Sequence, residues 1–288
     1  MIKLVASDMD GTLLGLDGRI SEHNAQVIRE LQNKNVEFLI CTGRSYLDAS
    51  LPLKEHNLSC PMICMNGSAI YDKAGQLVDK IPLTRKLLRF ILECCDQECL
   101  DSEHHGICFD FMTATGNLTI SSEPLIRRYF EENILLPMAD TVSYEDIRSR
   151  FEIVNREQIL SSEYEIFKMS LIHPDQQVLE RVKNRLKAET DLAVAASHYT
   201  NLEITHSGAQ KGLALLKYAG MHGIRSKEIM ALGDSENDTS MLSLPLGYTL
   251  AMENGMDSIK KVARCQTRSN DRDGVAFAIE TMVLEPSV

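Results

Sequence analysis

The sequence predicts an α/β protein with a Rossmann-like, doubly wound parallel sheet as its core and an α+β domain inserted into that core. Apolar, strand-sized runs alternate with amphipathic helical patterns in the first third of the chain, and this alternation returns near the C-terminus. The middle follows a different, mixed pattern. The chain has 288 residues, enough for two domains of roughly 100–200 residues each. We therefore expect a core of residues 1–83 and 199–288 and an inserted domain of residues 84–198.

The first part of the predicted core contains three strands and a hairpin. Apolar runs at residues 2–7, 37–41 and 61–65 have the length and composition of buried strands, and Ser21 begins a helix after the first of them. Residues 68–72 and 77–81 flank Lys73-Ala74-Gly75-Gln76, a pattern typical of a β-hairpin.

The inserted domain and the second part of the core are predicted from the same periodicities. In the insert we expect helices at residues 84–99, 123–133 and 175–189 and strands at 107–112, 118–121 and 166–172. In the returning core we expect helices at residues 211–222, 237–244 and 274–284 and strands at 229–232 and 248–252.

Composition excludes several classes of partner and location. With 30 Lys and Arg against 41 Asp and Glu, the net charge of −11 repels a phosphate backbone, so nucleic acid is not an expected partner. No apolar run approaches the roughly 20 residues that span a bilayer. The N-terminus reaches Asp8 before a signal-peptide core could form, so we expect a cytoplasmic protein.

The eight cysteines are dispersed without Cys-x-x-Cys spacing and are expected to be reduced thiols. Cys94, Cys95 and Cys99 with His104 and His105 could form a metal cluster. Because the cysteines lie in an amphipathic helical pattern, burial in an apolar core is the favoured interpretation.

Polar residues follow the first two predicted strands. Asp8 and Asp10 come at the carboxyl end of the first strand, the edge at which open α/β sheets bind ligands. In regular strand geometry both would face one side, whereas at a strand-to-loop junction they could converge on a crevice; a simple Asp-Gly turn is a third possibility. Thr42 and Gly43 follow the second strand and supply a hydroxyl and backbone donors for an anion, although a glycine turn before a helix is the favoured interpretation of this motif taken alone.

Two further segments strengthen the prediction of a site. Lys211 begins a predicted helix, where the helix dipole disfavours a lysine that has no anionic partner. Asp234, Glu236, Asn237 and Asp238 follow the strand at residues 229–232. Their mutual repulsion is relieved by a hard divalent cation with oxygen ligands, for which Mg²⁺ is the expected ion. The alternative is a solvated acidic loop that caps the next helix.

In this order, the four segments resemble the haloacid dehalogenase superfamily, specifically the Cof-type phosphatases with a type IIB cap domain. The motifs that carry the resemblance are Asp8-x-Asp10-Gly11-Thr12, Thr42-Gly43-Arg44, Lys211 and Gly233-Asp234-x-x-Asn237-Asp238, with Asn66-Gly67, Ala251-Met252-Glu253-Asn254 and Asn270-x-x-Asp273-Gly274-Val275-Ala276 in support. The segment Ser243-Leu244-Pro245-Leu246-Gly247 departs from the usual small Ala-Gly step of the family.

The resemblance implies a Mg²⁺-dependent phosphatase that hydrolyses small phosphorylated metabolites, such as sugar phosphates or phosphorylated cofactors, through an aspartyl phosphate. It implies that Asp8 is the nucleophile and Asp10 the general acid and base. It further implies that phosphate is bound by Thr42, Gly43, Lys211 and Asn237, and the metal by Asp8, the Asp10 backbone carbonyl, Asp234 and Asp238. A phosphomutase with the same chemistry is the alternative enzyme. A non-catalytic metabolite-binding regulator is disfavoured, because nucleophile, acid and lysine are all present.

In the family, the cap confers substrate specificity. The polar cap residues His104, His105, Arg127, Arg128 and Lys168 are candidates for substrate contact, but solvated surface positions are the favoured interpretation for each of them. Neither the physiological substrate nor the oligomeric state follows from the sequence.

Overall fold

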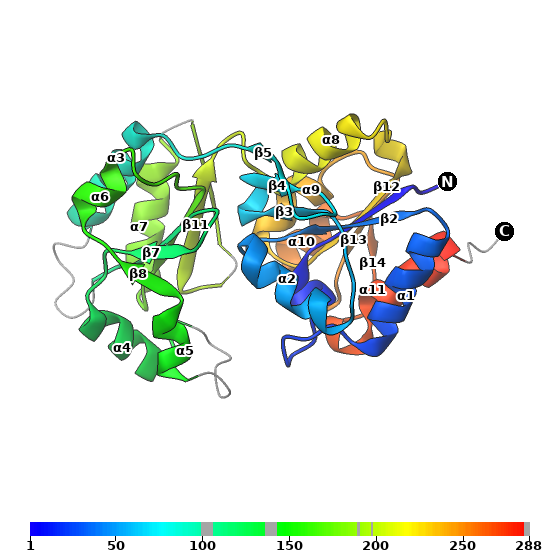
Figure 1. Cartoon of the computed structure of the whole chain (residues 1–288), viewed down its shortest axis with the longest axis horizontal. Coiled ribbons are helices and arrows are strands. Elements are labelled where there is room, and N and C mark those ends of the chain that lie inside the picture. The colour runs from blue at the N-terminus through cyan, green and yellow to red at the C-terminus, as the bar shows by residue number, and fades with distance from the viewer. Residues whose placement is uncertain (99–105, 136–142, 189–190, 197, 285–288) are drawn as a thin grey trace. The chain divides into compact units, whose positions relative to one another are not determined.

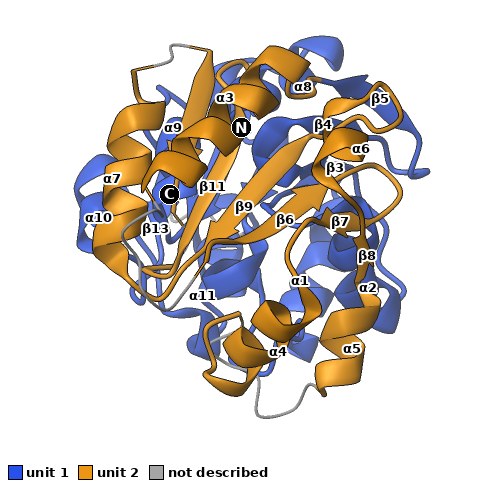
Figure 2. Cartoon of the chain, turned by 90° about the vertical axis from the view of Figure 1, so that its left-hand side faces the viewer, with its two compact units in different colours: residues 1–80, 209–288 blue, residues 81–208 orange. Residues whose placement is uncertain are grey.

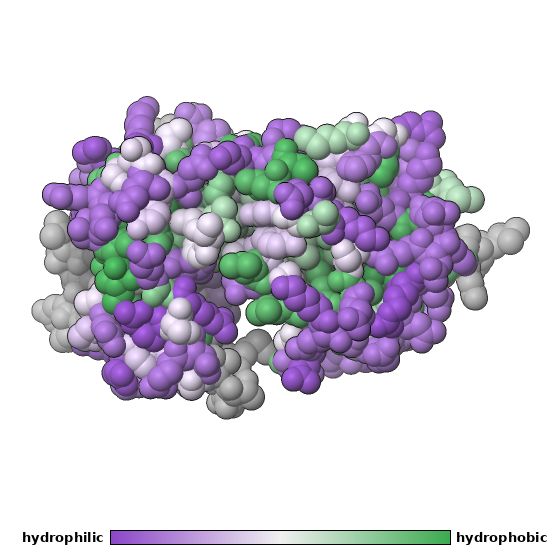
Figure 3. Space-filling view, viewed as in Figure 1, coloured by the Kyte–Doolittle hydropathy of each residue, from purple (hydrophilic) through white to green (hydrophobic). Residues whose placement is uncertain are grey.

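The computed structural model describes residues 1–98, 106–135, 143–188, 191–196 and 198–284. The chain forms two compact units, the first made of residues 1–80 and 209–288 and the second of residues 81–208 (Figures 1 and 2). The face drawn in Figure 3 is mainly hydrophilic and carries smaller hydrophobic patches, as expected for a chain in which 25% of residues are charged.

The first unit contains an eight-stranded sheet in the order β14-β13-β12-β1-β2-β3-β4-β5. The strands from β14 to β3 run parallel, and β4 and β5 are antiparallel, so the predicted doubly wound sheet and its terminal hairpin are confirmed. The strands are β1 (Leu4–Ser7), β2 (Glu37–Cys41), β3 (Met62–Cys64), β4 (Ala69–Tyr71), β5 (Leu77–Lys80), β12 (Ile229–Gly233), β13 (Tyr248–Ala251) and β14 (Cys265–Gln266).

Helices cover both faces of this sheet, which is why its central strands are buried throughout (Figure 1). Successive residues of a strand point to opposite faces. Leu4 and Ala6 pack in one cluster with Leu215 of α8, whereas α1 and α11 contact each other. The helices are α1 (Glu22–Asn33), α2 (Tyr46–Glu55), α8 (Lys211–Met221), α9 (Thr239–Leu242), α10 (Asp257–Val262) and α11 (Gly274–Ile279).

Two predicted helices of this unit differ from expectation. The helix expected at residues 237–244 is divided into a 3₁₀ turn, Glu236–Asp238, and the short α9. The turn is stabilised because the Asp238 carboxylate accepts backbone N–H groups of the loop before it. The helix expected at residues 274–284 ends as an α-helix at Ile279 and continues as a wider π turn over Glu280–Leu284.

The second unit contains a six-stranded sheet in the order β10-β11-β9-β6-β7-β8. Its strands are β6 (Cys108–Met112), β7 (Asn117–Thr119), β8 (Phe151–Ile153), β9 (Lys168–Ile172), β10 (Leu192–Ala195) and β11 (Asn201–His206). Its helices are α3 (Arg85–Glu98), α4 (Glu123–Glu131), α5 (Tyr144–Ser149), α6 (Arg156–Leu160) and α7 (Gln176–Leu186).

Strand β11 changes the expected domain boundary. The sequence analysis placed residues 199–208 in the core, but β11 pairs with β9 and β10 of the second unit. Leu202 and Ile204 on β11 fill the apolar interior of that unit, which is why the segment belongs there. The contacts divide the chain after residues 80 and 208, rather than after 83 and 198.

The predicted burial or exposure of the cysteines and polar residues of the insert is confirmed for some of them and wrong for Lys168. Cys94 and Cys95 are buried in the apolar core of the second unit, whereas Cys99, His104 and His105 lie outside the described residues. Arg127 and Arg128 are exposed as expected. The expectation for Lys168 is wrong, because its side chain is almost fully buried beside Glu203. Among the described residues, no helix has the length and apolar character of a membrane span.

The ends of α11 are tied to α1 by a histidine, which generates a prediction about stability. The His23 ring nitrogens lie 2.8 Å from a Glu280 carboxylate oxygen and 3.3 Å from one of Asp273. The hydrogen bond to Glu280 raises the His23 pKa, and partial burial opposes this without cancelling it. The stabilisation is therefore complete below the ordinary histidine pKa and is lost as the pH rises through the raised pKa of the folded state.

We expect His23→Gln to lower the free energy of unfolding more at pH 5.5 than at pH 8.5, by up to about 1 kcal/mol, because the pair is partly exposed. Urea unfolding of both proteins at the two pH values measures this difference. His222→Gln, a change at an exposed histidine after α8, serves as the control. An equal loss at both pH values would show that His23 acts through packing alone.

Candidate active site

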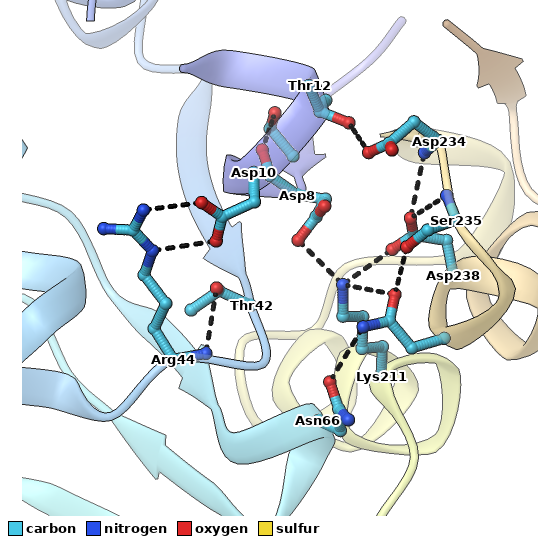
Figure 4. A network of polar contacts seen from close by, with 12 residues as sticks. Asp8, Asp10, Thr12, Thr42, Arg44, Asn66, Lys211, Asp234, Ser235 and Asp238 are labelled. Carbon is cyan, nitrogen blue, oxygen red and sulfur yellow. Dashed lines mark hydrogen bonds and ion pairs between the residues drawn. The ribbon is translucent and has the colours of Figure 1, made fainter. Parts of the chain in front are cut away.

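Asp8 lies directly after β1, at the carboxyl edge of the parallel sheet. Its backbone N–H donates to the carbonyl of Leu232 on the neighbouring strand, which continues the sheet ladder by one residue. Its buried carboxylate points toward α8, where Oδ1 accepts a hydrogen bond of 2.7 Å from Lys211 Nζ (Figure 4). The sheet thus delivers one carboxylate to a place enclosed by protein.

Lys211, the first residue of α8, has no exposed surface and links three acceptors. Besides Asp8, its Nζ donates to Asp238 Oδ1 at 2.7 Å and to Asn237 Oδ1 at 3.2 Å. Burial acts to lower the Lys211 pKa, but the carboxylates of Asp238 and Asp8 outweigh it and raise the pKa above its ordinary value. A positive charge at the positive end of a helix is therefore balanced by two anionic partners.

The loop after β12 is shaped by hydrogen bonds to Asp238. Asp238 Oδ2 accepts the backbone N–H groups of Asp234 and Ser235 at 2.9 and 3.1 Å. A side chain at Gly233 would place its Cβ 2.4 Å from Asp238 Cγ, so glycine is required for this close approach. The compact loop brings Asp234 to the same edge of the sheet.

The loop after β1 contacts Asp234 from the other side. Thr12 Oγ1 donates to Asp234 Oδ1 at 2.8 Å. Gly11 has a φ of +73°, and a Cβ there would lie 2.5 Å from Asp234 Oδ2. Glycine therefore serves both the left-handed backbone and the close packing of the two loops.

Asp8, Asp234 and Asp238 form a compact group of carboxylates. One oxygen of each lies within 4.8 Å of the others. Burial raises the Asp8 pKa well above its usual value, Asp238 and Asp234 add to the increase, and Lys211 opposes it. Burial and the charge of Asp238 raise the pKa of Asp234 to about 7. Three carboxylate oxygens this close together, two of them from residues with raised pKa values, fit a hard divalent cation, which would relieve their repulsion.

The side chain of Asp10 points away from this carboxylate group. Both of its oxygens are bound by the Arg44 guanidinium, with Nε–Oδ2 and Nη2–Oδ1 distances of 2.8 and 2.5 Å. The geometry of the strand-to-loop junction thus separates the two acids, with Asp8 directed to Lys211 and Asp10 to Arg44 (Figure 4). The Asp10 side chain is more than half exposed, unlike that of Asp8.

The residues expected to bind phosphate lie around the two acids. Thr42 is buried after β2, and its Oγ1 accepts the backbone N–H of Arg44 at 3.1 Å; Gly43 connects the two. Asn237 Oδ1 is shared by Lys211 and the Ser235 hydroxyl. All the predicted site residues therefore lie in the first unit at the carboxyl ends of β1, β2 and β12 or at the start of α8.

Sequence analysis assigned no role to four residues of this network. Arg44 pairs with Asp10, Thr12 with Asp234, Ser235 with Asn237, and Asn66 with Asn237 through a hydrogen bond of 3.4 Å. All four lie within the motifs quoted for the resemblance, so their closeness in the sequence to the predicted site residues could have identified them as further site residues. Their partners follow from side-chain directions, which the motifs do not specify.

Comparison with known proteins finds similarity over nearly the whole chain. Residues 5–279 match the haloacid dehalogenase-like hydrolase family. The 5-amino-6-(5-phospho-D-ribitylamino)uracil phosphatase YwtE of Bacillus subtilis is 28% identical over 292 residues, which cover 98% of each chain. A solved haloacid dehalogenase-like hydrolase from B. subtilis superposes with a TM-score of 0.83 at 25% identity, covering 98% of this chain and 100% of that one. A subclass IIB sugar phosphatase shares the fold, with a TM-score of 0.78 at 20% identity, covering 96% and 98%.

The buried lysine generates a prediction about stability. Lys211→Met leaves Asp8 and Asp238 buried without their shared cation, so we expect the free energy of unfolding to fall by about 3 kcal/mol at pH 8. Burial already raises the Asp8 pKa, and loss of the lysine that opposes this increase would raise it further in the variant, so stability should be regained as the pH falls and Asp8 is protonated. Denaturant unfolding in EDTA at pH 8 and pH 5.5 measures both effects.

Lys217→Met is the matched control, because Lys217 lies on the same helix in a partly exposed ion pair with Asp79. This change should cost less than about 1 kcal/mol. Equal losses for the two variants would contradict a central electrostatic role of Lys211.

Proposed function

Since the chain belongs to the haloacid dehalogenase-like hydrolases, we propose that this phosphoric monoester hydrolase is a Mg²⁺-dependent phosphatase of small metabolites that works through an aspartyl phosphate on Asp8. The observation that carries the proposal is the position of Asp8 at the end of β1, bound to Lys211 and within 4.8 Å of Asp234 and Asp238. It combines a carboxylate nucleophile with a fixed cation and a group of oxygen ligands.

In the first step, a carboxylate oxygen of Asp8 attacks the phosphorus atom of the substrate. The new Asp8–phosphorus bond forms as the bond to the leaving oxygen breaks, which gives an acyl phosphate and an alcohol. Lys211 stabilises the negative charge of the transferring group, because its ammonium already lies 2.7 Å from Asp8 Oδ1. In the second step, water attacks the same phosphorus and restores the Asp8 carboxylate.

Asp10 moves the protons in both steps. It donates one to the leaving oxygen and then accepts one from the attacking water. Because Arg44 binds both carboxylate oxygens in the structure, one of these hydrogen bonds must be exchanged before Asp10 can contact the substrate. Arg44 therefore acts in this proposal as a positioning residue that holds Asp10 between turnovers.

The remaining site residues bind phosphate and metal. We assign the non-bridging phosphate oxygens to Thr42, Gly43 and Lys211, with Asn237 orienting the lysine through its hydrogen bond. Mg²⁺ would be held by the carboxylates of Asp8, Asp234 and Asp238 and by the backbone carbonyl of Asp10. When bound, the ion supplies charge neutralisation that keeps the Asp8 carboxylate ionised next to the phosphate.

We assign substrate selection to the second unit, because the proposed catalytic residues all lie in the first. The named substrate of the relative YwtE is a phosphate ester of a small metabolite, which supports this size class. A cytoplasmic location is retained from the sequence analysis as part of the proposal.

The nucleophile is tested by Asp8→Asn. The amide cannot form the acyl phosphate, so turnover should fall about 10³-fold or more while the protein stays folded. Phosphate release from a panel of phosphorylated metabolites and circular dichroism measure the two quantities, and Asp17→Asn at an exposed loop position is the control. Trapping a phosphoryl adduct on a residue other than Asp8 would overturn the assignment. A product that retains phosphate at a new position would identify a phosphomutase instead.

The metal site is tested by removal and by substitution. EDTA should abolish phosphate release and added Mg²⁺ should restore it. Asp234→Asn should weaken Mg²⁺ binding in calorimetry by at least about tenfold, since a charged ligand is lost. Asp257→Asn, at an exposed acid on α10, should leave binding unchanged. Full activity after verified metal removal would rule out this part of the proposal.

A further inference from the structure

The loop that follows β13, residues 252–256, packs against the backbone of one acidic loop of the candidate site. Met256 N–H donates to the carbonyl oxygen of Asp234 at 2.8 Å. A Cβ at Gly255 would lie 3.1 Å from the Cα and from the carbonyl oxygen of Asp234. The backbone that carries the Asp234 carboxylate is therefore held by the neighbouring loop.

The same loop reaches the loop after β1 through one side chain. Asn254 Nδ2 donates to the carbonyl oxygen of Gly11 at 2.7 Å, although the two residues are 243 positions apart in the sequence. Gly11 precedes Thr12, whose hydroxyl donates to Asp234 Oδ1 at 2.8 Å (Figure 4). Each of the loops after β1, β12 and β13 therefore contacts the other two.

The orientation of the Asn254 amide is fixed at its other end. Its Oδ1 accepts the backbone N–H of Asn270 at 3.0 Å, and the buried Asn270 side chain donates from Nδ2 to the carbonyl of Leu14 at 2.8 Å. Because the amide of Asn254 uses both its donor and its acceptor, a rotation that exchanged them would break both hydrogen bonds. The two asparagines thus bind the loop after β1 at two of its carbonyl groups.

Gly11 is the residue of that loop whose backbone is least restricted. It has a φ of +73°, and a side chain is excluded because a Cβ there would lie 2.5 Å from Asp234 Oδ2. Glycine has wide conformational freedom, so the residue itself does little to fix the peptide group between Gly11 and Thr12. The hydrogen bond from Asn254 to the carbonyl of that peptide group supplies the restraint.

We propose that Asn254 is a positioning residue for the metal site: it holds the peptide group between Gly11 and Thr12, so that the Thr12 hydroxyl keeps the Asp234 carboxylate in place. Replacing residues that orient metal ligands without contacting the ion typically costs about 10- to 100-fold in metal affinity. All the contacts of this route lie within the first unit. The inference rests on the proposed function, in which Asp234 is a ligand of Mg²⁺.

The first experiment titrates the metal-free, full-length protein with Mg²⁺ by calorimetry. We expect Asn254→Ala to raise the dissociation constant by roughly tenfold, because the hydrogen-bond partner of Asp234 loses its restraint. Asn33→Ala, at the exposed asparagine that ends α1, is the matched control and should leave the dissociation constant unchanged. Since Asn254 is also exposed, thermal unfolding of the two metal-free variants should be nearly equal.

The titration separates failure of this inference from failure of the proposed function. Equal dissociation constants for the unchanged protein and folded Asn254→Ala would overturn the inference alone. If the unchanged protein does not bind Mg²⁺, the proposed function itself is contradicted. If Asn254→Ala does not fold, Asn254→Ser carries the test, because it also removes the amide donor but keeps a polar side chain.

The second experiment is a double-mutant cycle with Thr12→Val, which removes the hydroxyl and keeps the branched shape of the side chain. If Asn254 acts through Thr12, the double variant should lose no more Mg²⁺ affinity than Thr12→Val alone. Losses that multiply would show that Asn254 affects the metal site by another route, and the inference would be withdrawn.

Discussion

The ammonium group of Lys211 is the interaction on which the site depends. It joins Asp8 at the end of the first strand to Asp238 and Asn237 after β12, residues separated by more than two hundred positions along the chain. Because the lysine is entirely buried, its charge is tolerated only with these partners in place. Asp8 in turn depends on the lysine, since burial and the neighbouring carboxylates already oppose its ionisation. The same charges that assemble the site are those to which the proposed function assigns phosphate and metal binding.

The parallel sheet makes this arrangement possible. The carboxyl ends of parallel strands lie at the same edge of a sheet, so the loops that follow β1, β2 and β12 come together there. The close approach then depends on small residues: at Gly11 and Gly233 a side chain would collide with Asp234 or Asp238. Glycine thus occupies the positions where the loops that carry the carboxylates come into close contact. The edge brings the groups near one another, and the glycines allow the final packing.

The two faces of the sheet in the second unit differ in their side chains. Its helix-covered face contains the Leu and Ile residues that hold the unit together. The other face combines a smaller apolar cluster around Cys108 with the buried pair of Lys168 and Glu203, whose Nζ and Oε1 atoms lie 2.6 Å apart.

Much of the fold could be predicted from the sequence, because hydrophobic periodicity and turn residues report local structure. The alternation of strands and helices, the hairpin before residue 81 and the positions of the acidic motifs at strand ends were all local signals. The motifs also identified Asp8, Asp234 and Asp238 as residues of one edge, since parallel strands order their ends in space.

Only the tertiary structure decided how those residues are used. Asp8 and Asp10 are two positions apart, yet one points to Lys211 and the other to Arg44, because the chain turns between them at the strand end. The assignment of β11 to the second unit depends on pairing with β9, a contact between distant segments. Burial of Lys168 depends on the same pairing, which places Glu203 beside it. Periodicity describes which side chains share a face, whereas partners and burial are set by contacts that form only when the strands come together.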